Sequence, residues 1–145
     1  MRTARVLLVA FFAALVVACT SYRVEGPGGY SHKGVIITPQ LLEVKGSKLR
    51  LRFTFVNHTE EEIVVDRNQM QLMLPDGQVM ARFKGTWGGM TKGFHQIPAG
   101  ASHDVFMDFK LEEEPPEELL LQLTGVLQDG KPMDLPDYPV KIYVE

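Results

Sequence analysis

Apolar and polar residues alternate along several short stretches of the chain, with a period of two that is typical of β-strands. The clearest stretch is KLRLRFTFVN, residues 48–57. Apolar side chains occupy every second position there, as Leu49, Leu51, Phe53 and Phe55. Because successive side chains of a strand point to opposite faces, this pattern predicts a strand with one face in a core and the other in water.

A tight turn is expected between two further apolar runs, residues 69–74 and 78–83. The runs are separated by a segment that contains Asp76-Gly77. These two residue types tolerate the positive φ angles that a tight turn requires, so the two runs are expected to pair as a hairpin.

Alternation returns in the second half of the chain, in the stretches SHDVFMDFKL, ELLLQLTGV and YPVKIYVE. In the first of these, Met107 is in phase with Val105 and Phe109, which predicts that Met107 belongs to the core. With a first strand in VIIT or LLEV, the pattern gives seven or eight short strands and no helix. An all-β domain over residues 35–145, folded as an antiparallel β-sandwich, is therefore expected.

The first residues differ from the rest of the chain. Two arginines, Arg2 and Arg5, precede an apolar run from Val6 to Ala18. As a helix, this run of about 13 residues would reach roughly 20 Å, which is short of the roughly 30 Å hydrocarbon core of a bilayer. A basic start followed by a short apolar run is the layout of a secretion signal, so residues 1–18 are expected to be a signal peptide.

Cys19 is the only cysteine of the chain and directly follows the apolar run, so no intramolecular disulfide is possible. Val16-Val17-Ala18-Cys19 resembles the lipobox of bacterial lipoproteins, with Val16 where leucine is usual. The resemblance implies cleavage between Ala18 and Cys19, a diacylglycerol on the thiol and an acyl chain on the new amino group. A lone free thiol is a liability in an oxidising compartment, which favours lipidation over the alternative that Cys19 is a buried small residue.

The same resemblance implies a location. The acyl chains on Cys19 would tie the protein to a membrane of the cell envelope, since two or three chains give stable attachment. Thr20, in place of an aspartate after the cysteine, favours the outer membrane of a Gram-negative host, with the domain on its periplasmic or surface side. Residues 19–34 are polar and glycine-rich after the cysteine, and we expect them to form a flexible tether.

Net charge excludes one class of partner. The two arginines of the signal leave with it, so 13 of the 15 basic residues face 18 acidic ones, a net charge of −5. A negative chain without a basic stripe is not suited to nucleic acid. The acidic run EEEPPEE, residues 112–118, lacks the spacing of a calcium loop and is expected to be a solvated connector.

Residues 41–125 look like the telokin-like, immunoglobulin-like modules of bacterial surface lipoproteins. The resemblance lies in the long stretch LRLRFTFVNHTEEEIVV, the hairpin at LPDG and the stretch QIPAGASHDVFMDFKL with its Pro-x-Gly turn. It implies an immunoglobulin-like sandwich, although the cysteine pair and buried tryptophan of antibody-type domains are missing from this pattern. The architecture alone does not identify a function, because one fold serves many unrelated functions.

A long glycine-rich segment, residues 85–97, is the candidate binding loop. It contains Trp87, Met90, Phe94 and His95, and recognition residues concentrate on loops held by rigid scaffolds. The alternative is that its aromatic residues fold back and cap one end of the sandwich.

A metal site is the second candidate, because thioether and imidazole ligands suit copper. HQIPAGASHDVFM faintly resembles the His-and-Met segment of periplasmic copper chaperones, with His95, His103 and Met107 as ligands. On a strand, however, residues four apart lie about 13 Å from one another, so His103 and Met107 would not reach one ion unless the strand bulged. We therefore expect no cofactor or resident metal.

The sequence predicts a protein that binds and does not catalyse. It carries no nucleophile elbow, phosphate-cradling glycine loop or His-Glu-x-x-His motif, and neighbours such as Ser102 and His103 point to opposite faces of a strand. We therefore expect a lipid-anchored envelope lipoprotein acting as a binding or scaffold module for an envelope protein partner. A periplasmic copper or small-ligand carrier and a purely structural spacer are the alternatives.

Overall fold

Strands make up nearly all the regular structure in the computed structural model, which describes residues 20–84 and 93–145. The expected sites at Ala18, Cys19, Trp87 and Met90 lie outside the described residues. Thirteen strands occur within the described ranges: β1 (Tyr22–Glu25), β2 (Tyr30–His32), β3 (Val35–Lys45), β4 (Lys48–Asn57), β5 (Ile63–Asp66), β6 (Gln71–Met73), β7 (Val79–Arg82), β8 (Phe94–Ile97), β9 (Ser102–Lys110), β10 (Glu118–Gln122), β11 (Val126–Gln128), β12 (Lys131–Pro132) and β13 (Tyr138–Val144). A 3₁₀ turn, η1 (Arg67–Gln69), follows β5.

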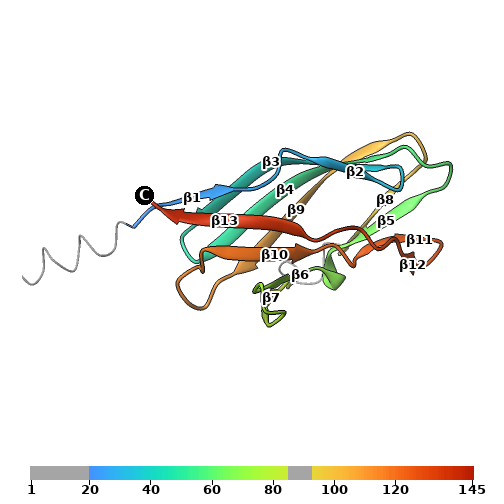
Figure 1. Cartoon of the computed structure of the whole chain (residues 1–145). Helices are drawn as coiled ribbons and strands as arrows, with labels where there is room; N and C mark the ends of the chain where they lie inside the picture. Colours follow the sequence, from blue (N-terminus) through green and yellow to red (C-terminus); the bar gives the residue numbers. More distant parts are fainter. Residues whose placement is uncertain (1–19, 85–92) are drawn as a thin grey trace, which may run out of the picture.

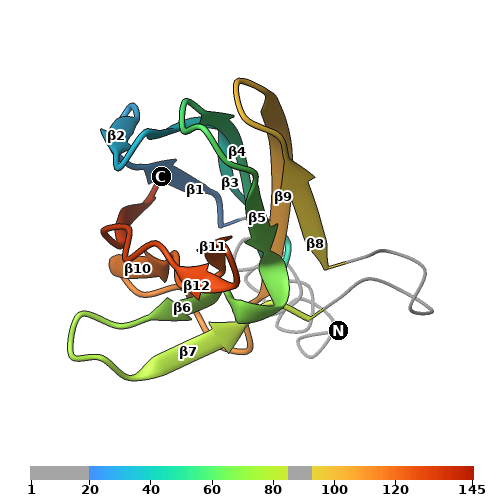
Figure 2. The same ribbon diagram turned by 90° about the vertical axis from the view of Figure 1, so that its right-hand side faces the viewer.

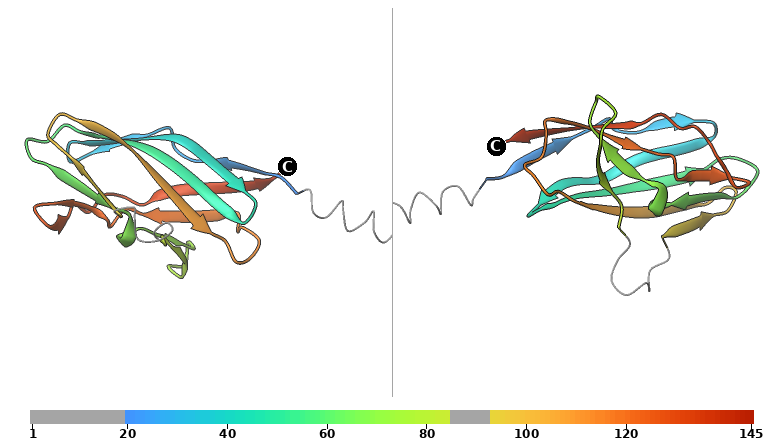
Figure 3. Two further views of the ribbon diagram at one scale, coloured as in Figure 1. Left: turned by 180° about the vertical axis from the view of Figure 1, so that it is seen from behind. Right: turned by 90° about the horizontal axis from the view of Figure 1, so that it is seen from below.

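The strands form three antiparallel sheets that pack together as an all-β sandwich (Figures 1 and 3). One sheet has the order β1-β13-β10-β6-β7, the second has the order β2-β3-β4-β9, and the third has the order β12-β11-β5-β8. Seen along the strands, the sheets surround a common interior (Figure 2). Within the described part of the chain, no helix is long and apolar enough to cross a membrane.

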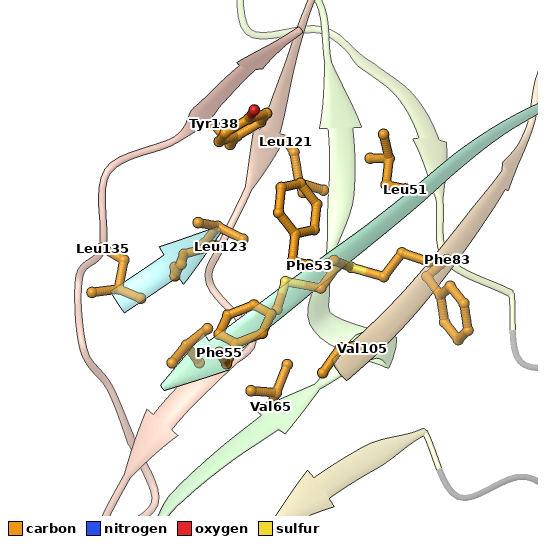
Figure 4. Packing of buried hydrophobic residues seen from close by; sticks show 14 of the residues in the cluster. Leu51, Phe53, Phe55, Val65, Phe83, Val105, Leu121, Leu123, Leu135 and Tyr138 are labelled. Carbon is orange, nitrogen blue, oxygen red and sulfur yellow. The ribbon is translucent and has the colours of Figure 1, made fainter. Parts of the chain in front are cut away.

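The core follows from the alternation of β4 and β9, which pair along nearly their whole length. Leu49, Leu51, Phe53 and Phe55 of β4 are all fully buried, as the period of two predicted. Met107 is fully buried with Val105 and Phe109 on β9, so its expected place in the core is confirmed. The side chains of the two sheets interlock around Phe53, whose ring centre lies 4.9 Å from that of Tyr138 on β13 (Figure 4).

The expected hairpin is confirmed as β6 and β7, with a register shift between Leu72 and Met73. Its turn places Gly77 at φ +90°, a conformation that residues with a side chain rarely adopt. The Asp76 side chain accepts a hydrogen bond from the main-chain nitrogen of Gln78 at 2.9 Å.

The expectation of a flexible tether over residues 19–34 is wrong where the chain forms β1 and β2, because both strands belong to sheets. β1 pairs with β13, and β2 pairs with β3. Gly26 lies against the ring of Tyr138, where a Cβ atom would come within 2.5 Å of the hydroxyl. That hydroxyl donates to the main-chain oxygen of Pro27, so the exposed glycine-rich segment is fixed against Tyr138.

The expected count of seven or eight strands is too low, because short segments outside the alternating stretches also form strands. The additional strands are short, such as β2, β11 and β12 with two or three residues each. Alternation cannot be recognised over so few residues, and these strands are held by pairing with a neighbouring strand. β2 pairs with the adjacent β3, β12 pairs with the adjacent β11, and β11 also pairs with the distant β5.

A buried asparagine joins three segments where β4 ends. Asn57 is fully buried, and its side-chain amide nitrogen donates to the main-chain oxygens of Glu61 (2.8 Å) and Ile97 (3.0 Å). Its side-chain oxygen accepts from both the main-chain nitrogen (2.9 Å) and the hydroxyl (2.6 Å) of Thr59. Its own main chain bonds to Gly100 and Ala101, so Asn57 fixes the turn that leads from β8 to β9.

Candidate functional sites

The turn between β8 and β9 brings two of the expected site residues together. β8 pairs with β5 and places His95 beside Val65, whereas β9 pairs with β4 and places His103 beside Phe55. The chain passes from one sheet to the other between them, and Nδ1 of His95 lies 3.0 Å from Nε2 of His103. A separation of 3.0 Å suits a hydrogen bond in which one ring nitrogen donates and the other accepts.

The third expected ligand is not part of this pair. Met107 is fully buried in the core, four residues beyond His103 on β9. Within residues 20–84 and 93–145, no group of three or more histidine, cysteine or acidic side chains is placed to hold a metal ion. The structure therefore unites His95 with His103 and separates both from Met107.

Electrostatics at the pair favour the neutral state of His95. Burial lowers the pKa of His95 below the ordinary value of 6.5, and the charges of Arg67 and His103 lower it further. Arg67, on η1, is itself buried, and its guanidinium donates to the main-chain oxygen of Phe106 at 3.0 Å. Burial lowers the pKa of Arg67, while the nearby Asp108 carboxylate partly restores it. Arg67 was not expected at a site, because nothing in a sequence marks a single arginine as buried.

The fold should lose stability in acid through His95. A histidine with a lowered pKa binds fewer protons in the folded than in the unfolded state. The stability it contributes is therefore full above the ordinary pKa of 6.5 and is lost as the pH falls from that value to the lowered pKa of the folded state. We expect the urea midpoint to fall between pH 7.5 and pH 5.5, and to fall less in His95→Gln. Equal falls in the two proteins would contradict this assignment.

Phe94, the remaining residue of the expected binding loop, is 43% exposed at the start of β8. A second exposed aromatic, Phe106 on β9, is 46% exposed and lies under the guanidinium of Arg52 at 5.3 Å. Both occupy outward positions of edge strands, so the sandwich offers apolar side chains along this side, where Arg67 already bonds to the main-chain oxygen of Phe106.

A groove between β7 and β9 is the feature that sequence reasoning missed. β7 and β9 are edge strands of different sheets, and each is hydrogen-bonded to only one neighbour in the described sheets. The groove between them has a volume of ≈ 470 Å³, with Met80, Ala81 and Phe83 among the residues of its wall. Residues that line an open strand edge are well placed to receive the main chain of a partner.

Four basic side chains line this groove: Lys48, Arg82, Lys84 and Lys110. Lys48 and Lys110 are directly opposite each other on β4 and β9, an arrangement of like charges that destabilises a sheet. Among the described residues none of the four forms a salt bridge, and Asp108 and Glu112 are the acidic residues of the lining. They come from three separate parts of the sequence, around residues 48, 82–84 and 110, so only the fold reveals that they gather in one place.

No protein-family model matches the chain, and no curated protein matches it. Among solved structures, the yjhA protein from Bacillus subtilis is similar, with a TM-score of 0.49 and 11% sequence identity. The similarity covers 67% of this chain and 78% of that chain. A likeness at this level carries no functional information.

Proposed function

We propose that this chain is a lipid-anchored lipoprotein of the bacterial cell envelope, and that it acts as a non-catalytic binding module for a protein partner. The anchor is the lipidated Cys19 that the lipobox implies. The observation that carries the binding role is the groove between β7 and β9, because it combines two open strand edges with a basic rim in a chain whose expected mature net charge is −5.

The groove fits an extended acidic segment of a partner protein. Edge strands accept a further strand through main-chain hydrogen bonds, and side-chain pockets then add specificity. Carboxylates of the incoming segment would relieve the repulsion between Lys48 and Lys110, which the described part of the chain leaves unpaired. Opposite charge also speeds the encounter of the two proteins.

Photo-crosslinking in intact cells tests this role. A benzoylphenylalanine placed at Ala81, in the groove, should crosslink to one envelope protein through a segment rich in acidic residues. The same group placed at Lys131, on β12 and outside the groove, is the control and should give no such product. Absence of a stoichiometric protein product from position 81 would contradict the proposed binding role.

Reversing a charge in the groove should weaken the binding of the partner. Lys110→Glu places a carboxylate where the partner's own carboxylates would bind, and like charges across an interface cost several kcal/mol. We expect at least about a tenfold loss of affinity, which corresponds to about 1.4 kcal/mol. Lys131→Glu, the same change on an exposed lysine outside the groove, should bind like the wild type. Equal affinities for the two variants would exclude the groove as the binding site.

A second candidate function is a carrier of copper, favoured by the contact between His95 and His103. Both imidazoles present nitrogen atoms that copper accepts, although the Arg67 charge near His95 opposes a cation there. A carrier should bind one equivalent of Cu(I) or Cu(II) below micromolar concentration and lose it in His95→Ala. Met107→Leu should bind as the wild type does, because Met107 lies in the core. Binding that is weaker than micromolar would exclude the carrier.

A further inference from the structure

The start of β1 lies very close to the expected anchor, which limits how far the domain can stand from a membrane. Only Thr20 separates Cys19 from Ser21, and the main-chain oxygen of Ser21 already accepts a hydrogen bond from Glu145 at 3.0 Å. A fully extended residue spans at most about 3.6 Å, so Tyr22 lies within about 11 Å of the Cα atom of Cys19. The headgroup layer on each side of a bilayer is itself about 5 to 8 Å thick.

The end of the sandwich that carries Tyr22 has apolar and aromatic side chains that no element of residues 20–84 and 93–145 covers. Val144 pairs with Tyr22, continues the inward-facing row of Val140 and Ile142, and is nevertheless 72% exposed. Tyr143 is 39% exposed on the opposite face. The apolar alternation of β13 therefore runs past the end of the core, at the tip where β1 begins and β13 ends (Figures 1 and 3).

The chemistry of this tip suits the interface of a bilayer. The guanidinium of Arg23 lies over the ring of Tyr143 at 4.8 Å from its centre, and both side chains combine an apolar body with a polar end. Tyrosine is enriched at the level of lipid headgroups, and arginine stems lie along apolar surface while the charge stays in water. Glu117, Glu118 and Lys141 line the hollow beside Tyr143, and this lining with an excess of negative charge suits zwitterionic headgroups better than anionic ones.

We propose that the β1–β13 tip, formed by Tyr22, Arg23, Tyr143 and Val144, lies in the headgroup layer of the membrane that holds Cys19. The inference rests on the proposed lipid anchor, and it fixes the orientation of the domain. The turn between β11 and β12, at the opposite end of the molecule, then points away from the bilayer (Figure 1).

Fluorescence quenching on vesicles tests the orientation. Because Cys19 is the only cysteine and its thiol is taken by lipid, a single new cysteine is labelled alone. The mature lipidated protein would be reconstituted into vesicles of phosphatidylethanolamine and phosphatidylcholine, with bimane at Val144→Cys or, as control, at Lys131→Cys on β12. A nitroxide on the lipid headgroups should quench the label at position 144 at least threefold more than the label at position 131.

Mass spectrometry of the same sample distinguishes a wrong orientation of the domain from a missing lipid anchor. Equal quenching at the two positions, with Cys19 carrying its lipid, would overturn the orientation and leave the anchor in place. An unmodified Cys19 would overturn both.

Discussion

Replacement of Phe53 by alanine is expected to lower the free energy of unfolding by about 3 to 5 kcal/mol, the usual cost of deleting a fully buried aromatic side chain. Phe53 is fully buried, and its ring meets those of Tyr138 at 4.9 Å and Phe55 at 6.4 Å between centres. It therefore joins the sheet of β4 to the sheet of β13. The loss combines the transfer energy of the ring with a cavity that two facing sheets cannot close.

Phe106→Ala is the matched control for this experiment. Phe106 lies on β9, which pairs with β4, but its side chain is 46% exposed on the outer face. We expect a change of less than about 1 kcal/mol, since exposed positions seldom cost more. Urea unfolding followed by tyrosine fluorescence measures both variants. Similar losses for the two phenylalanines would show that the inner and outer faces of the sandwich are misassigned.

Asn57→Ala is expected to cost about 3 kcal/mol, because it leaves several buried polar groups without partners. The change removes two hydrogen bonds donated to the main chain, at Glu61 and Ile97, and two accepted from Thr59. Each buried group left unsatisfied costs about 1 to 3 kcal/mol, and relaxation of the turn recovers part of the total.

Asn68→Ala provides the comparison for Asn57. Asn68 is an exposed asparagine on η1, and its replacement should change the unfolding free energy by less than about 1 kcal/mol. Hydrogen exchange adds a local readout, since Asn57→Ala should speed exchange at Gly100 and Ala101, whose main chains bond to Asn57. A loss below about 1 kcal/mol for Asn57→Ala would contradict its role as the joint between β4 and the following turn.

The strands that could be predicted from the sequence are those whose own alternation is long enough to read. β4 was expected over the same residues that form it, and β9 was expected with Met107 inside, because nine or ten residues give four or five inward positions. β1 and β2 could not be predicted. They have four and three residues, lie among glycines, and exist because β13 and β3 pair with them.

The same distinction applies to the sites. His95 and His103 were singled out for their chemistry, and the structure places them in contact. Met107 was considered as a ligand and also expected in the core, and the core is where it lies. The cluster of Lys48 and Lys110 with the basic residues of the β7 edge was missed, because it depends on how edges of two sheets meet. No sequence pattern within a single strand shows which edges of two sheets lie side by side.

Mass spectrometry of the protein isolated from its native membrane tests the lipid anchor, on which the proposed location and orientation depend. We expect a chain that begins at Cys19, with a diacylglycerol on the thiol and an acyl chain on the amino group. A free thiol at Cys19, or a chain that retains residues 1–18, would contradict it.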